Sequence, residues 1–122
     1  MSDKELLELA AKAAGLINAR YHEAIAWEYD SGTCILHDTD NGRSTHAWNP
    51  LTDDGDAMRL AVLLSIDVMH RFVGGRRCEA LAPGGKVVEV FYQDGCDFYA
   101  PTRRAIVRAA AAIGQSKEGP TP

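Results

Sequence analysis

The sequence lacks the segments that mark membrane and secreted proteins. No apolar run approaches the roughly 18 residues that a membrane-spanning helix needs. The first residues, Met1–Glu5, are acidic, and they lack the basic start and the apolar run of a signal peptide. We therefore expect a cytoplasmic protein that does not bind membranes.

Cysteines and metal-ligand spacings are also scarce. Cys34, Cys78 and Cys96 are odd in number and widely spaced, which predicts buried thiols and no disulfide framework. The thiols form no Cys-x-x-Cys motif, and no two histidines stand at His-x-x-x-His spacing. We expect no metal and no cofactor, and a catalytic Cys/His site would have to be assembled by the fold.

What the sequence does contain is the composition of an ordinary globular domain. It has 122 residues, of which 46% are hydrophobic and 25% are charged, and a chain of this length can bury roughly two-thirds of its unfolded surface. We expect one domain over residues 1–114 and a polar, mobile tail over residues 115–122. The net charge of −4 is uneven, because acids dominate residues 1–67 and bases dominate residues 68–122.

Apolar residues at helical spacing predict three helices. The first has a capping box made by Ser2 and Glu5 and a glycine at its end. The second begins at Thr52 or Asp53 in a cluster of acids that the helix dipole favours. The predicted ranges are Ser2–Gly15, Thr52 or Asp53 to Arg71, and Thr102–Gly114.

Alternating apolar residues between turn signals predict the strands. Their ranges are Glu23–Tyr29, Thr33–His37, Ser44–Trp48, Arg76–Leu81 and Lys86–Tyr92, with the third less strongly indicated. The order is thus α-β-β-(β)-α-β-β-α, without a repeat period. Short turns between the strands predict an α+β fold in which helices pack on one mainly antiparallel sheet. Apolar residues on both faces of Lys86–Tyr92 allow helices on both sides of it, which would make a three-layer α/β/α sandwich.

Arginines are concentrated in the second half of the sequence. Two of them follow a Gly-Gly turn, and three lie on the last predicted helix. If the fold brings them together, they could bind a small anion such as a nucleotide, with a tryptophan stacking on it. The predicted ligand contacts are Arg76, Arg77, Arg103, Arg104, Arg108 and Trp48. Solvated arginines remain the alternative, and the overall acidity disfavours nucleic acid as a partner.

Two segments resemble a family of small phage proteins. Trp48–Ala61, with the sequence WNPLTDDGDAMRLA, resembles the W-(N/S)-P-(L/S)-T-D signature of the phage ABA sandwich domain family. Thr102–Ala110 is similar to the C-terminal helix of that family. The resemblance implies an α/β/α layered fold and a phage or prophage origin, but no activity and no catalytic residue. It also implies that Trp48 packs beside the following helix as a hydrophobic lead-in.

Three functions stay open on these observations. The first is a non-enzymatic phage or prophage accessory protein that binds a host or phage macromolecule, in particular a protein, in the host cytoplasm. Countering host defence is one role of that kind. The second is a protein that binds a small anionic ligand, and the third is a small enzyme with a Cys/His site assembled in space. Edge strands of a small sheet would also allow a homodimer.

Overall fold

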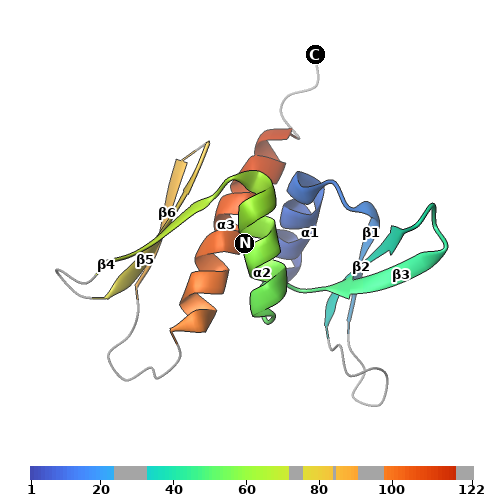
Figure 1. Ribbon diagram of the computed structural model, residues 1–122, viewed down its shortest axis with the longest axis horizontal. Coiled ribbons are helices and arrows are strands. Elements are labelled where there is room, and N and C mark those ends of the chain that lie inside the picture. Colours follow the sequence, from blue (N-terminus) through green and yellow to red (C-terminus); the bar gives the residue numbers. More distant parts are fainter. Residues whose placement is uncertain (24–32, 72–75, 84, 91–97, 118–122) are drawn as a thin grey trace.

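The helices of this protein form a layer between two small sheets. The computed structural model describes residues 1–23, 33–71, 76–83, 85–90 and 98–117, which form three helices and two three-stranded antiparallel sheets. One sheet lies on each side of the helical layer (Figure 1). The predicted α+β class, the antiparallel strands and the packing of helices on sheets are confirmed, but the layers run sheet, helices, sheet and not α/β/α as expected. The strands form two sheets instead of the single one expected, because α2 carries the chain across the helical layer after the third strand.

Helix α1 (Asp3–Ala14) begins and ends as its sequence predicts. The side chain of Ser2 accepts a hydrogen bond from the backbone N–H of Glu5 at 3.2 Å. At the other end Gly15 takes a left-handed conformation with φ 72°, and the N–H of Leu16 donates to the carbonyl of Ala11 at 3.1 Å. This Schellman arrangement turns the chain sharply out of the helix.

The first sheet follows directly from that turn. It contains β1 (Ile17–His22), β2 (Cys34–Thr39) and β3 (Ser44–Trp48) in the order β1-β2-β3. The predictions for β2 and β3 are confirmed. The first strand precedes the predicted range Glu23–Tyr29, and of that range all but Glu23 lies outside the described residues.

Helix α2 (Asp54–Leu64) is shorter than predicted. Asp53 caps it, because its carboxylate accepts the N–H of Asp56 at 2.8 Å. The prediction that the helix runs to Arg71 is wrong. Ser65 takes a left-handed conformation with φ 56°, and the N–H of Ile66 donates to the carbonyl of Ala61 at 2.9 Å. The chain then continues as β4 (Asp67–Arg71), where pairing with the next strand overrides the helical spacing of the apolar residues.

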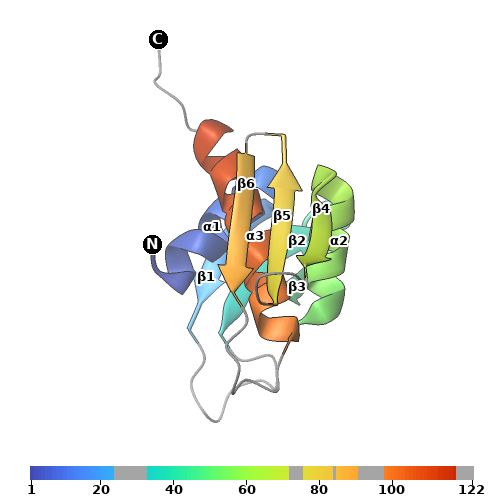
Figure 2. The same ribbon diagram turned by 90° about the vertical axis from the view of Figure 1, so that its left-hand side faces the viewer.

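The second sheet contains β4, β5 (Arg77–Ala82) and β6 (Gly85–Val90) in that order, within one residue of the two predicted strand starts. Figure 2 shows this sheet in front of α3 (Tyr99–Lys117). That helix is longer at both ends than predicted, so residues 115–117 of the expected tail are helical. Residues 118–122 lie outside the described residues.

Helices α1 and α3 pack closely against each other at the centre of the fold. Small residues make this possible, since Ala10, Ala11, Ala109 and Ala110 are all buried there. Gly114 lies so near the backbone of Leu9 that a side chain at this position has no room. The ammonium of Lys117 then donates to the carbonyl of Ala13 at 3.0 Å.

The chain therefore repeats one structural unit, a helix followed by a three-stranded meander. Both α1 and α2 end in the same pair of hydrogen bonds around a left-handed residue, and each is followed within two residues by a strand. Helix α3 closes the second unit. No repeat of this kind is visible in the sequence.

Candidate functional site

Helix α2 exposes an unusual amount of apolar surface. The side chains of Met58, Val62 and Leu63 are 63%, 71% and 61% exposed, while Ala57 and Leu60 on the opposite side are buried. We call these three exposed residues the α2 outer face. Helix α2 packs mainly on α1 and α3, and Figure 1 shows it standing in front of them between the two sheets. Arg59, whose side chain is 72% exposed, lies between Met58 and Leu63 around the helix, so the exposed apolar side chains lie on two sides of a cation.

Two open pockets flank the α2 outer face. The hairpin pocket, of about 440 Å³, lies between α2 and the β2–β3 hairpin. The α3 pocket, of about 880 Å³, lies between α2, β4 and α3. Leu63 lines the first, and Met58 and Val62 line the second. The outer face is therefore a ridge between two depressions.

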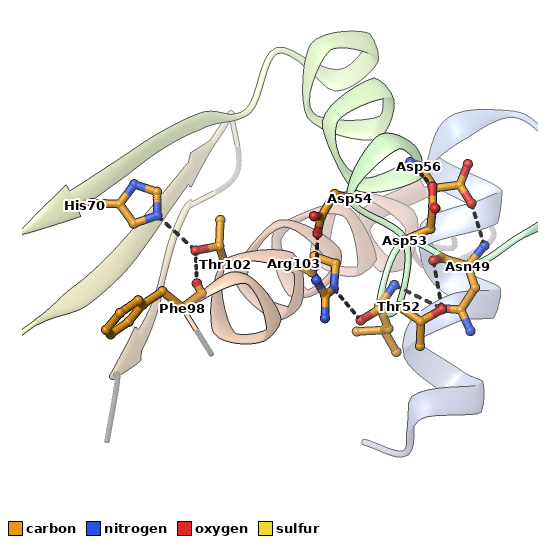
Figure 3. A network of polar contacts seen from close by, with 10 residues as sticks. Asn49, Thr52, Asp53, Asp54, Asp56, His70, Phe98, Thr102 and Arg103 are labelled. Atoms are coloured by element: carbon orange, nitrogen blue, oxygen red, sulfur yellow. Dashed lines mark hydrogen bonds and ion pairs between the residues drawn. The ribbon is translucent and has the colours of Figure 1, made fainter. Parts of the chain in front are cut away.

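The distinctive Trp48–Asp56 segment has a structural explanation. The amide of Asn49, a buried residue, donates to the carbonyl of Thr33 at 2.7 Å, and its side-chain oxygen accepts the N–H of Leu51 at 2.9 Å. The backbone N–H of Asn49 donates to the carboxylate of Asp56 at 3.0 Å (Figure 3). These bonds fix the turn that leads from β3 into α2. Trp48 is the last residue of β3 and directly precedes this turn.

Trp48 belongs to the core rather than to an exposed stacking site. It is 8% exposed, lies opposite Ile35 in the first sheet, and belongs to the same hydrophobic cluster as Ala57 and Leu60 of α2. One edge of the indole also lines the hairpin pocket. This location agrees with the lead-in role implied by the family resemblance.

The predicted arginine contacts separate into distinct groups. Arg103 bridges α3 to the start of α2: its Nε donates to the carbonyl of Leu51 at 2.8 Å, and its guanidinium pairs with Asp54 at 2.6 Å (Figure 3). Arg104 and Arg108 instead both pair with Glu89 of the second sheet, at 3.7 and 2.8 Å, and Arg104 lies nearer still to Asp3 of α1, at 3.1 Å. Neighbours on one helix thus point to different partners.

Arg76 and Arg77 lie near the start of β5. The guanidinium of Arg76 stacks over the ring of Phe98, with its central carbon 3.8 Å from the ring centroid. Arg77 pairs at 3.1 Å with Glu79, which sits on the outward face of the second sheet. The structure does not bring the five predicted arginines to one pocket. Each of the five instead contacts a carboxylate or an aromatic ring of this chain.

Glu79 is a buried carboxylate surrounded by cations. Besides Arg77, it lies 3.4 Å from Arg71 and 3.6 Å from Lys86. The hydrogen bond from Arg77 and the neighbouring positive charges hold the pKa of Glu79 below its usual range. The carboxylate therefore stays ionised and holds three strand residues together on this face.

The strand register places each described cysteine opposite a histidine. His22 pairs with Cys34 in the first sheet, and His70 pairs with Cys78 in the second. Both thiols are buried, and burial raises their pKa values, which disfavours the reactive thiolate. The arrangement does not favour nucleophilic catalysis by either thiol. Cys96 lies outside the described residues.

His70 has a structural partner. Its Nε2 lies 2.9 Å from the hydroxyl of Thr102, which itself donates to the carbonyl of Phe98 at 2.9 Å (Figure 3). Because the hydroxyl proton is used in that second bond, the histidine must be the donor in the first. The pair ties β4 to the start of α3.

Within the residues that the structure describes, no helix is long and apolar enough to cross a membrane. No protein-family model, curated protein or solved structure matches the chain. The resemblance to the phage ABA sandwich domain family therefore stays a prediction that rests on Trp48–Ala61 and Thr102–Ala110.

Proposed function

We propose that this chain is a non-enzymatic binding protein whose partner is another protein that covers the α2 outer face. The observation that supports the proposal is the exposure of Met58, Val62 and Leu63 on one helix, between two open pockets. Several large apolar side chains exposed on one helix of a small protein are typical of an interaction site.

The energetics indicate how large the interface must be. Fully burying a side chain of this size contributes about 1.5–3 kcal/mol. Because roughly two-thirds of each side chain is still exposed, covering all three would contribute about 3–6 kcal/mol. Association costs at least about 4 kcal/mol, so these residues would be the anchors of a larger interface that includes the two pockets.

The charges beside the α2 outer face suggest the chemistry of the partner. Asp53 and Asp54 at the start of α2 have largely exposed carboxylates, although each also contacts an arginine of this chain. We expect a partner surface with an apolar centre and basic residues where it meets this end of α2. On the family resemblance alone, we propose that the partner is a phage or host protein and that this chain is a phage accessory protein.

The proposal can be tested with a pulldown from bacterial lysate, identified by mass spectrometry. The bait is the full chain, compared with a Met58→Asp/Val62→Asp double variant. Ile17→Asp is the matched control, because Ile17 is also 63% exposed but lies on β1. We expect a specific protein that wild type and the Ile17 variant retain and the double variant loses. Binding of that protein in purified form should weaken by more than about tenfold, or about 1.4 kcal/mol.

Two results would contradict the proposal. One is recovery of the same proteins by wild type and by the double variant. The other is a homodimer in light scattering that the Met58/Val62 substitutions convert to a monomer, which would identify a second copy of the chain as the occupant. Both substitutions replace exposed side chains, so their effect on stability should stay within about 0.5 kcal/mol.

A further inference from the structure

Two histidines meet in the hairpin pocket. His37 on β2 and His46 on β3 are directly opposite in the antiparallel register, so their side chains leave the same face of the first sheet. Their ring centroids are 5.9 Å apart, and the ring planes are inclined by 34°. Both rings line the pocket, on the side of the sheet that faces α2.

The ring nitrogens of this pair are available. Among the residues that the structure describes, neither the His37 ring nor the His46 ring makes a side-chain hydrogen bond, and the two rings contact each other. His70 differs, because its Nε2 is held by Thr102. His46 is exposed and His37 is half-buried, so solvent reaches both rings. Two adjacent imidazoles that solvent reaches can take up an ion from it.

The separation of the rings suits a metal ion. With metal–nitrogen bonds of about 2.0–2.1 Å and ring nitrogens about 1.1 Å from the centroids, two imidazoles at tetrahedral positions have centroids about 5.1 Å apart. The observed 5.9 Å is about 0.8 Å longer, a difference that small side-chain rotations can close. Imidazole nitrogens prefer zinc, copper and nickel to the oxygen-seeking calcium and magnesium.

The surroundings leave the ion partly open. The pocket volume of about 440 Å³ leaves room for an ion with bound water. In the part of the chain that the structure describes, no three His, Cys, Asp or Glu side chains are grouped so that they could hold a metal. The carboxylate of Asp56 lines the same pocket, where it pairs with Arg59 at 2.8 Å. Arg59 lines the pocket as well and offsets the charge of this carboxylate, so the two imidazoles must supply the binding of the ion.

We propose that His37 and His46 bind a divalent late transition-metal ion of the Zn²⁺ class, with water or a ligand in the remaining positions. The site uses no residue of the α2 outer face except that Leu63 lines the same pocket. The proposed partner would cover this pocket, but the metal is tested on the chain alone, so failure of one proposal can be told from failure of the other.

The test is calorimetric titration of Zn²⁺ into the full chain, prepared without a histidine tag and stripped with chelator. A Cys96→Ser background removes a competing thiol whose position is not described. We expect one Zn²⁺ per chain, with affinity at least about tenfold weaker in His37→Gln and in His46→Gln. His22→Gln, on the neighbouring strand β1, is the matched control and should keep the wild-type affinity. Circular dichroism of each variant separates loss of binding from loss of fold.

A second measurement localises the ion. Trp48 lines the same pocket as the two histidines, so Cu²⁺ bound there should quench its fluorescence in a Trp27→Phe background, which leaves Trp48 as the single tryptophan. The quenching should disappear in His46→Gln. Absence of Zn²⁺ binding to the wild type would overturn the proposal. Unchanged affinity in the His37→Gln/His46→Gln double variant would overturn it equally, because the ion would then occupy an adventitious site.

Discussion

Replacing Gly114 by alanine would test how closely α1 and α3 pack. An added Cβ would lie 2.8 Å from the carbonyl carbon of Leu9 and closer still to its oxygen, whereas carbon atoms in contact lie about 3.5–4.0 Å apart. The obstacle is backbone, which cannot rotate away, so the helices must separate by about 1 Å. Such overpacking costs about 1–3 kcal/mol.

The sign of the effect is set by two opposing terms. Alanine favours a helix over glycine by about 0.8–1.0 kcal/mol, so the expected net loss for Gly114→Ala is about 2 kcal/mol when the clash is at the upper end of its range. For a chain of this size that corresponds to a melting temperature about 8 °C lower. Urea unfolding followed by circular dichroism measures the loss directly.

Gly55→Ala is the matched control, because it makes the same change inside α2. There the added Cβ would meet the guanidinium of Arg59 at 3.1 Å and the carboxylate of Asp53 at 3.2 Å. The guanidinium of Arg59 can move away, whereas the Asp53 oxygen is the one that caps α2 and must shift by a few tenths of an ångström. The gain from alanine and the cost at the cap oppose each other, so we expect the stability to change by no more than about 0.5 kcal/mol. If Gly114→Ala were as stable as wild type while Gly55→Ala behaved as expected, the close approach of α1 and α3 would be refuted.

Three further predictions concern single side chains. Ser65→Gly should stabilise the protein by about 0.5–1 kcal/mol in urea unfolding, because glycine adopts the left-handed conformation at the end of α2 without strain; a loss would contradict that conformation. Asn49→Ala should cost about 2 kcal/mol in the same assay, since it leaves two backbone groups without their side-chain partners. Arg77 and the other cations hold the pKa of Glu79 below its unfolded-state value, so the stability that this carboxylate contributes is present above that value and lost as the pH falls through the folded-state pKa. Glu79→Gln should therefore flatten the acid side of a pH–stability profile, and an unchanged acid slope would count against the ion cluster.

Local hydrogen-bonding chemistry explains which parts of the fold are predictable from sequence. A short sequence pattern alone specifies some helix ends. The structure confirms the predicted caps at Ser2, Gly15 and Asp53. The end of α2 cannot be predicted from such a local pattern. Its apolar spacing continues past Leu64, and no glycine marks the stop, because a serine takes the left-handed position. Only pairing of β4 with β5 reveals that the following residues form a strand.

The candidate sites show a different limit. The arginines attract attention by their charge, but whether Arg103 and Arg108 share a pocket depends on how α3 is oriented between α2 and the second sheet. Helical spacing does not separate Met58 and Val62 from the buried residues of α2, and their exposure follows from the position of α2 in front of the other helices. The pairing of His37 with His46 depends on strand register, which a turn of uncertain length leaves open in the sequence.

The unequal lengths of α1 and α3 bear on the location of the histidine pair. Helix α3 has 19 residues and is about 28 Å long, whereas α1 has 12 residues and is about 18 Å long. The long helix packs along β5 and β6 of the second sheet. Its Arg104 and Arg108 form ion pairs with Glu89 on the inner face of that sheet. The short helix packs on α3 and, in the first sheet, on β1 and β2. The pocket that His37 and His46 line lies between β2, β3 and α2 instead, so the histidine pair is on the part of the first sheet that α1 covers least, where a ligand can reach it.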